Sequence, residues 1–172
     1  TNVSVAGLTG NTTYHFFIIT VVDATNSNGN NSYSTALTSN KTTLCNPVDS
    51  FTITFEESSS LPSCTSFLST DGLGANVNTT YPYQGIRCLG LQNATTYILP
   101  KVTNGHLNTH AINFYGRTFS GTGQIGFGYL IDPSDAATYV NLQTFNLTTT
   151  YQYCTFNPVD IPQNASLAIK LL

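Results

Sequence analysis

The stretch Gln124–Val140, QIGFGYLIDPSDAATYV, decides the fold class. Its first part alternates, so that Ile125, Phe127, Tyr129 and Ile131 lie on one face of an extended strand. The glycines and one leucine between them lie on the other face, which we expect to be at least partly exposed to water. The DPSD segment that follows is rich in turn formers and predicts an Asx-type turn between strands.

Further segments rich in β-branched and aromatic residues recur along the chain, separated by Gly, Asn, Asp, Ser and Pro. Helical periodicity over 11 or more residues is absent. The sequence therefore predicts an all-β fold of the sandwich type. The expected strands are Val3–Leu8, Tyr14–Val22, Ser34–Thr43, Phe51–Phe55, Ile86–Leu91, Thr96–Leu99, Ala111–Tyr115, Gln124–Ile131, Thr138–Leu142, Gln152–Phe156 and Ser166–Leu171.

A domain boundary is expected near LCNPVDS, residues 44–50, where a strand ends and a proline interrupts the pattern. This divides the chain into residues 1–44, a linker at 45–50, and residues 51–172. The first part is shorter than most chains that hold a core alone, since below about 40 residues extra support is usual. Because the first residue is Thr1 and the chain has no Met, we expect a piece of a longer protein.

The composition excludes two classes of partner. Charged residues make up 8% of the 172 residues, against roughly 25% in an average protein. Polarity comes instead from 18 Asn, 28 Thr and 15 Ser. The five basic residues stand singly, which excludes nucleic-acid binding: they are Lys41, Arg87, Lys101, Arg117 and Lys170. The longest apolar run, Phe16–Val22, is far below the ~20 residues of a membrane helix, so membrane insertion is not expected.

Four cysteines, Cys45, Cys64, Cys88 and Cys154, show no CxxC spacing. An even count in such a chain favours disulfides and an oxidising compartment, and hence a secreted or cell-surface protein. Of three possible connectivities, we prefer Cys45–Cys64 with Cys88–Cys154, and four free thiols are the alternative.

Eight N-x-S/T sequons are glycan acceptors if the protein passes through a eukaryotic secretory pathway. Otherwise they reflect the Asn- and Thr-rich composition. They lie at Asn2, Asn11, Asn30, Asn40, Asn78, Asn93, Asn146 and Asn164.

Residues 3–43, VSVAGLTGNTTYHFFIITVVDATNSNGNNSYSTALTSNKTT, resemble the second half of a fibronectin type III domain. The features that match are the G-L-T-x-x-T-x-Y turn, a long apolar strand, a Gly/Asn hairpin and a Ser-rich strand. The resemblance implies a tyrosine corner at Leu8 and Tyr14, in which the Tyr hydroxyl bonds back to the backbone.

Residues 51–172 resemble the jelly-roll modules of secreted Bacteroidetes surface proteins, akin to cleaved-adhesin and meprin-type adhesion domains. We expect this module to lack its last strand. The resemblance implies a structural Ca²⁺ held by Glu56 and Asp71, for which a solvated strand end and a Gly turn are the alternative. The matching residues are Phe55, Glu56, Leu61, Pro62 and Cys64, then Leu99 and Pro100, then Ile112, Phe114 and Arg117, and finally Ile125–Val140.

No catalytic arrangement is found. Glu56 and Glu57 are adjacent and would point to opposite faces of a strand. A G-x-S-x-G motif is absent. The pair His106 and His110 has helical zinc spacing, but it lies beside a glycine and before a strand. We therefore expect no enzyme activity.

The candidate carbohydrate site consists of Tyr81, Tyr83, Tyr115 and Arg117. The first two are loop aromatics in TTYPYQG, and the other two could join them on an exposed sheet face. Ordinary strand packing of these tyrosines is the alternative.

The expected function is that of a non-catalytic module of a secreted cell-surface adhesin-like protein, in adhesion or as a repeat or filament unit. The alternative is a carbohydrate-binding appendage of a secreted glycoside hydrolase or peptidase. Expected partners are a glycan or protein on a cell surface or matrix, and neighbouring modules of the same protein, up to a homo-polymer.

Overall fold

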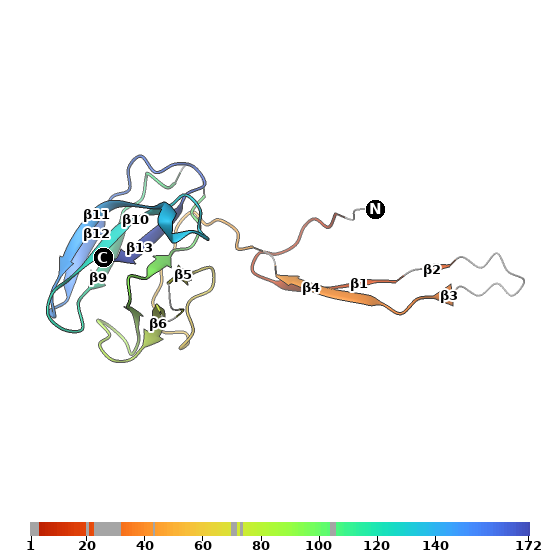
Figure 1. Ribbon diagram of the computed structural model, residues 1–172, viewed down its shortest axis with the longest axis horizontal. Coiled ribbons are helices and arrows are strands. Elements are labelled where there is room, and N and C mark those ends of the chain that lie inside the picture. The colour runs from red at the N-terminus through yellow and green to blue at the C-terminus, as the bar shows by residue number, and fades with distance from the viewer. Residues whose placement is uncertain are drawn as a thin grey trace, which may run out of the picture. The chain divides into compact units, whose positions relative to one another are not determined.

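The structure, a computed structural model, describes residues 4–19, 21–22, 32–42, 44–69, 72, 74–103 and 106–172 (Figure 1). Among these residues strands dominate, and the only helix is a 3₁₀ turn at Ala136–Thr138, so the all-β prediction is confirmed. The chain divides into two compact units, Thr1–Asn46 and Pro47–Leu172, and the expected linker at 45–50 spans this division.

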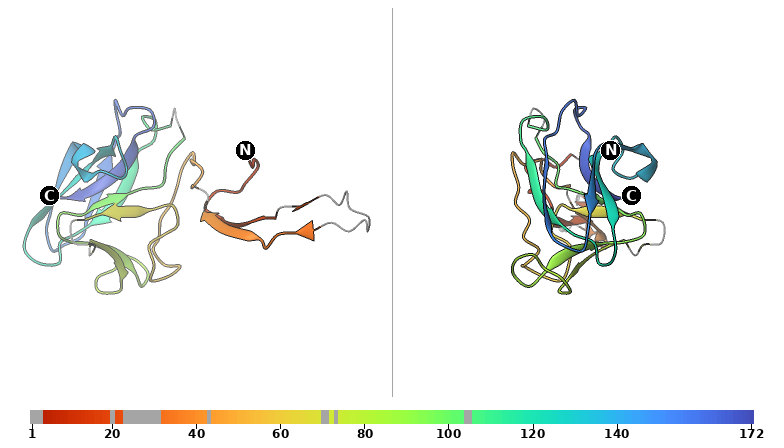
Figure 2. Two further views of the ribbon diagram at one scale, coloured as in Figure 1. Left: turned by 45° about the vertical axis from the view of Figure 1, so that its right-hand side comes forward. Right: turned by 90° about the vertical axis from the view of Figure 1, so that its left-hand side faces the viewer.

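The smaller unit is a long two-stranded ribbon (Figure 2). Strand β1 (Thr13–Ile18) pairs antiparallel with β4 (Leu37–Thr42), and β2 (Val21–Val22) pairs with β3 (Ser32–Tyr33). The Tyr14 hydroxyl accepts a hydrogen bond from the Thr9 backbone N–H at 2.9 Å, as the tyrosine-corner prediction requires. The described part of the expected first strand, residues 4–8, forms no strand.

The larger unit is built on a five-stranded antiparallel sheet in the order β11-β10-β13-β8-β5. Two smaller antiparallel sheets, β6–β7 and β9–β12, complete it. The bounds are β5 (Ser66–Leu68), β6 (Ala75–Asn78), β7 (Cys88–Leu91), β8 (Thr96–Ile98), β9 (Ile112–Gly116), β10 (Gly123–Leu130), β11 (Tyr139–Leu147), β12 (Gln152–Phe156) and β13 (Ser166–Leu171).

The main core lies between the large sheet and the small ones. Tyr97, Phe127 and Leu167 of the large sheet form one buried cluster with Phe156 of β12. Half-buried residues of β7 and β9, such as Phe114, pack against it. The inward faces of these strands therefore meet as period-2 alternation predicts.

Strand β10 differs from its prediction, because both of its faces are covered. Phe127 lies in the main core, and Leu130 on the other face is fully buried with Ile98 and Ala168. The face expected to be partly wet is therefore packed. Ile131 is exposed, since the strand ends at Leu130.

A β-bulge interrupts the pairing of β10 with β11 between Phe127 and Gly128. A Cβ at Gly128 would lie 1.9 Å from the Val140 carbonyl oxygen. The close approach of the two backbones at the bulge therefore requires glycine at this position.

The segment Phe51–Phe55 keeps its predicted alternation but forms no strand. Phe51, Ile53 and Phe55 are half-buried against the main core, while the two threonines between them are exposed. Conversely, β5 and β6 are strands that the sequence did not predict.

The predicted turn after β10 is confirmed. The Asp132 carboxylate accepts hydrogen bonds from the Ser134 backbone N–H at 2.8 Å and from its hydroxyl at 2.6 Å. These two bonds hold the pKa of Asp132 below its usual value, since they favour the charged form. The next acid, Asp135, accepts from the Ala137 N–H and begins the 3₁₀ turn.

One of the two expected disulfides forms. Cys45 and Cys64 are bonded to each other, whereas Cys88 and Cys154 are free thiols, so the second predicted pairing is wrong. Cys154 points inward from β12 into a cluster with Ile125 and Leu147. Cys88 begins β7 in a different sheet, where its thiol contacts the Asn78 amide oxygen at 3.4 Å.

Candidate functional site: an exposed tyrosine cluster

The ribbon formed by β9 and β12 has two chemically different faces. Its register places Phe114 opposite Cys154 and Tyr115 opposite Tyr153. Phe114 and Cys154 point into the unit, where Cys154 is buried. Tyr115 and Tyr153 point outward and remain 45% and 59% exposed. The ribbon thus presents aromatic side chains to solvent while its other face contributes to the core.

Loop residues extend this aromatic surface into what we call the tyrosine cluster. Tyr83 stacks on Tyr115, with ring centroids 3.7 Å apart and planes 11° apart. Tyr151 meets Tyr83 edge-on at 5.1 Å, and Tyr153 lies 5.1 Å from Tyr115. The cluster comprises Tyr81, Tyr83, Tyr115, Tyr151 and Tyr153, together with Phe119, which lies 5.6 Å from Tyr81, and Arg117.

Hydrogen bonds fix the loop that carries Tyr81 and Tyr83. The Tyr151 hydroxyl donates to the Tyr81 carbonyl oxygen. Further along, the Glu56 carboxylate accepts from the backbone N–H groups of Ile86 and Arg87 at 3.0–3.2 Å. Gly85, at φ +73°, leaves room for this carboxylate, since a Cβ there would lie 2.5 Å from its oxygen. Glu56 therefore orders the loop beside the cluster.

Arg117 supplies the positive charge of the cluster. Its guanidinium carbon lies 4.4 Å from the Tyr81 ring centroid and 5.7 Å from that of Tyr151. Its Nε donates to the Thr118 carbonyl oxygen at 3.1 Å. The hydrogen bond with Tyr83 raises the pKa of Tyr115, and burial raises the pKa of Tyr151. These two phenols are therefore neutral at physiological pH and can both donate and accept hydrogen bonds.

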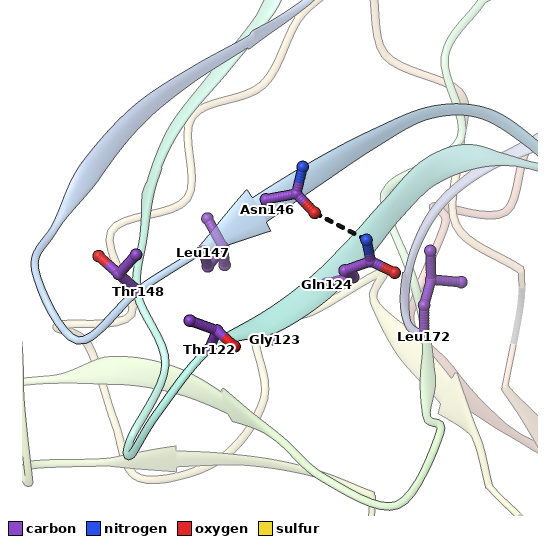
Figure 3. Close-up of a pocket in the computed structure, with 7 residues that line it drawn as sticks. All are labelled: Thr122, Gly123, Gln124, Asn146, Leu147, Thr148 and Leu172. Atoms are coloured by element: carbon purple, nitrogen blue, oxygen red, sulfur yellow. Dashed lines mark hydrogen bonds between the residues drawn. The ribbon is translucent and has the colours of Figure 1, made fainter.

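The residues of the cluster other than Tyr153 line a cavity of about 1240 Å³ within the larger unit. The cavity continues to core residues such as Leu89, Ile112 and Phe114, which explains why these apolar side chains are only half-buried. A second, shallower pocket of about 410 Å³ lies at the ends of β10 and β11 (Figure 3). There the Gln124 amide nitrogen donates to the Asn146 amide oxygen at 2.7 Å.

The structure brings together all four residues of the candidate carbohydrate site. Tyr81, Tyr83, Tyr115 and Arg117 belong to one contiguous cluster. Sequence reasoning missed Tyr151, Tyr153 and Phe119. The available signal was the YQY alternation at 151–153, which places both tyrosines on the face opposite Cys154.

The expected calcium site at Glu56 and Asp71 stays a prediction. Ca²⁺ takes six to eight oxygen ligands, and both carboxylate oxygens of Glu56 already accept backbone hydrogen bonds. The second expected ligand, Asp71, lies outside the described residues. Within the described part of the chain no group of three or more His, Cys, Asp or Glu could hold a metal ion.

The two histidines of HLNTH lie in a turn, where their ring centroids are 5.3 Å apart. His106 also approaches the Asp49 carboxylate, with 3.9 Å between nitrogen and oxygen. His106 therefore has a carboxylate beside it, and no group of three metal-binding side chains forms here among the described residues.

The sequons vary in how well they present the amide nitrogen. Asn78 is half-buried, and its amide nitrogen donates to the Asn76 side chain at 2.9 Å. Asn2 and Asn30 lie outside the described residues. The exposed acceptors are Asn11, Asn40, Asn93, Asn146 and Asn164.

Among the described residues, no helix has the length and apolarity needed to cross a lipid bilayer. Comparison with known proteins finds no family model, no curated protein and no solved structure that matches this chain.

Proposed function

We propose that this chain is a non-catalytic module of a secreted, cell-surface adhesin-like protein, and that its larger unit binds carbohydrate through the tyrosine cluster. The observation that carries the proposal is the outward pairing of Tyr115 with Tyr153 on a ribbon whose other face is packed. Contiguous exposed aromatic surface of this kind marks binding sites on soluble proteins. Tyrosine offers both an apolar ring face and a hydroxyl, and sugars present C–H faces edged by hydroxyl groups.

Mutual contact among the rings prepares the cluster for binding. Tyr83 and Tyr115 cover each other, so a sugar would stack on the flanking rings instead. Phe119 and Tyr153 are the most exposed aromatic side chains of the cluster, at 73% and 59%. Because the central rings already hold one another in place, little side-chain entropy is lost when a ligand binds.

The acidic groups nearby support a non-catalytic role. The described residues that line the cavity include two carboxylates, Glu56 and Asp49. Glu56 accepts backbone hydrogen bonds, and Asp49 lies near His106. Glycoside hydrolysis needs two carboxyl groups facing each other across the scissile bond, and neither group is placed within the tyrosine cluster.

A glycan-array screen of the whole chain tests the proposal. We expect wild-type protein to bind a subset of glycans, and the double variant Phe119→Ala/Tyr153→Ala to lose at least about 10-fold in affinity, or roughly 1.4 kcal/mol. The matched control is Tyr33→Ala, which removes an exposed tyrosine of the smaller unit. Equal binding by the double variant, or no binding by the wild-type protein, would contradict the proposal.

A second candidate function is that of a repeat or filament unit, which the smaller unit favours. Phe17, Ile18 and Leu37 are 68%, 63% and 70% exposed on a two-stranded ribbon. Such ribbons are marginally stable alone, and further β-structure packed on them would cover these side chains. Ile18 and Leu37 are paired residues and share one face of the ribbon. Sedimentation equilibrium over a concentration series tests this candidate, since self-association through that face should be abolished in Ile18→Ser/Leu37→Ser.

The same carbohydrate binding would also serve an appendage of a secreted glycoside hydrolase or peptidase. The two contexts differ in the domain that adjoins this chain: repeats of the same pair of units favour an adhesin, and a catalytic domain favours an appendage.

A further inference from the structure

We infer that the tyrosine cluster selects carbohydrates that carry a carboxylate, such as uronic-acid glycans, and that Arg117 is the residue that binds this group. This inference rests on the proposed function, since it names the class of glycan for the same site. Nothing in the packing of the cluster alone would favour an acidic over a neutral sugar, so the inference depends on the charges.

Positive charge is scarce in this protein yet gathers at the cavity. The chain has five Lys and Arg residues and a formal net charge of −3. Two of the five, Arg87 and Arg117, line the cavity beside the tyrosine cluster. A cation placed among neutral phenols in an otherwise weakly acidic protein creates a local attraction for anions.

Arg117 has no acidic partner among the described residues. The one ion pair found in the described part of the chain joins His106 to Asp49. The contacts of Arg117 are the Tyr81 and Tyr151 rings and, through Nε, the Thr118 carbonyl oxygen. Since Nε is engaged, the two terminal amino groups remain as donors, and a guanidinium with free donors binds a planar carboxylate through two parallel hydrogen bonds.

The neighbouring charges leave this role to Arg117 rather than to Arg87. Arg87 donates from Nη1 to the Glu56 carbonyl oxygen at 3.0 Å, while its own backbone N–H bonds to the Glu56 carboxylate. Arg87 therefore helps to order the loop, next to a negative charge. Arg117 instead lies against the Tyr81 and Tyr151 rings, with no acidic group among its contacts in the described part of the chain.

A comparison of matched sugars tests the inference. Binding of the whole chain would be measured by calorimetry for an oligogalacturonate, for the neutral oligogalactose obtained by reducing its carboxyl groups, and for a sulfated oligogalactose of the same length. We expect at least about 10-fold tighter binding of the oligogalacturonate than of the neutral sugar. The sulfated sugar shows whether the site selects the carboxylate itself or any anionic group, and we expect it to bind less tightly than the oligogalacturonate.

Variants assign the effect to one residue. Arg117→Gln should remove the preference for the carboxylate over the neutral sugar, and Arg117→Lys should restore part of that preference. The matched control is Lys101→Gln, which removes one exposed positive charge of the same unit outside the cavity. Circular dichroism shows whether each variant is folded. A further measurement needs no variant: on wild-type protein, methyl galacturonide should displace the bound oligogalacturonate at a lower concentration than methyl galactoside does.

The outcomes separate the inference from the proposed function. Neutral and acidic sugars bound equally, or a preference that survives Arg117→Gln, would overturn the inference and leave carbohydrate binding standing. Tightest binding of the sulfated sugar would also overturn it, because the selected group would not be a carboxylate. If none of the three sugars binds and the glycan array is silent, the proposed function fails together with the inference.

Discussion

Two antiparallel ribbons in this chain, β9–β12 and β1–β4, have similar lengths but different surroundings. The β9–β12 ribbon buries one face, where Phe156 is 2% exposed, and its outward tyrosines contact one another. The β1–β4 ribbon has no core behind it, and none of the described residues in 4–46 is buried. A two-stranded ribbon gains little stability by itself, so the difference teaches that an aromatic outer face can be held in order only where the inner face is packed.

The largest expected effect is on stability, and it comes from making the same substitution, Phe to Ala, in each of the two units. Phe127→Ala removes a fully buried ring from the main core and should lower the free energy of unfolding of the larger unit by about 3–5 kcal/mol. Phe17→Ala removes a ring that is mostly exposed, and should change stability by less than about 0.5 kcal/mol. Urea unfolding followed by circular dichroism measures both. A large effect of Phe17→Ala would show that the smaller unit buries this ring.

The strands that sequence reasoning located well are those whose pattern is local. Both β12 and β13 have their predicted bounds, because five or six alternating residues between turn formers define them. The short strands β5 and β6, SFL and ANVN, carry little pattern of their own and are fixed by pairing with β8 and β7. Phe51–Phe55 shows the reverse case: its alternation predicted a strand, but the segment only packs its apolar side chains against the core and pairs with no other strand among the described residues.

The candidate site was predicted in part for the same reason. Tyr81 and Tyr83 are recognisable from their own loop, Tyr115 from its strand, and Arg117 from its place just after that strand. The addition of Tyr153 depends on the register that places it opposite Tyr115, a pairing of residues far apart in sequence. The wrong Cys88–Cys154 pairing has this cause too, because the spacing of cysteines does not reveal which sheet each one joins.

The free thiols provide the second largest effect, and they compare the packed face of the β9–β12 ribbon with the half-buried start of β7. Cys154 lies on the packed face and Cys88 is half-buried at the start of β7. Native protein treated with iodoacetamide at pH 8 should be alkylated at Cys88 at least about 100-fold faster, because Cys154 reacts only when the core opens. Burial also raises the pKa of the Cys154 thiol, which lowers its reactive thiolate fraction.

Peptide mapping by mass spectrometry gives the two alkylation rates. The control is protein denatured without reductant, in which both thiols should react alike while Cys45 and Cys64 stay bonded. Native reaction of Cys154 as fast as that of Cys88 would mean that the β12 face is not packed.

A smaller effect is expected at the hydrogen bond that orders the entry to β1. Tyr14→Phe removes the hydroxyl that accepts from the Thr9 N–H and should cost about 0.5–1.5 kcal/mol. The loss should be confined to the smaller unit, so the amide of Thr9 would exchange faster with deuterium while the amides of β10 keep their rates. The control, Tyr33→Phe, changes an exposed tyrosine of the same unit. Faster exchange throughout the larger unit would show that the effect is not confined to the smaller unit.

The smallest expected effect on stability is in the turn between β10 and β11, where hydrogen bonds rather than burial lower the pKa of Asp132. Ser134 holds the pKa of Asp132 below its usual value, so this turn contributes stability above about pH 4 and loses it as the pH falls through the lowered pKa. Ser134→Ala removes the stronger, side-chain bond and should raise the Asp132 pKa, as followed by NMR titration of its carboxyl carbon. Because the carboxylate is exposed, the unfolding midpoint in acid should shift only slightly. If the variant instead destabilised the larger unit as much as Phe127→Ala does, its stability would reside in the turn rather than in the packed faces of its sheets.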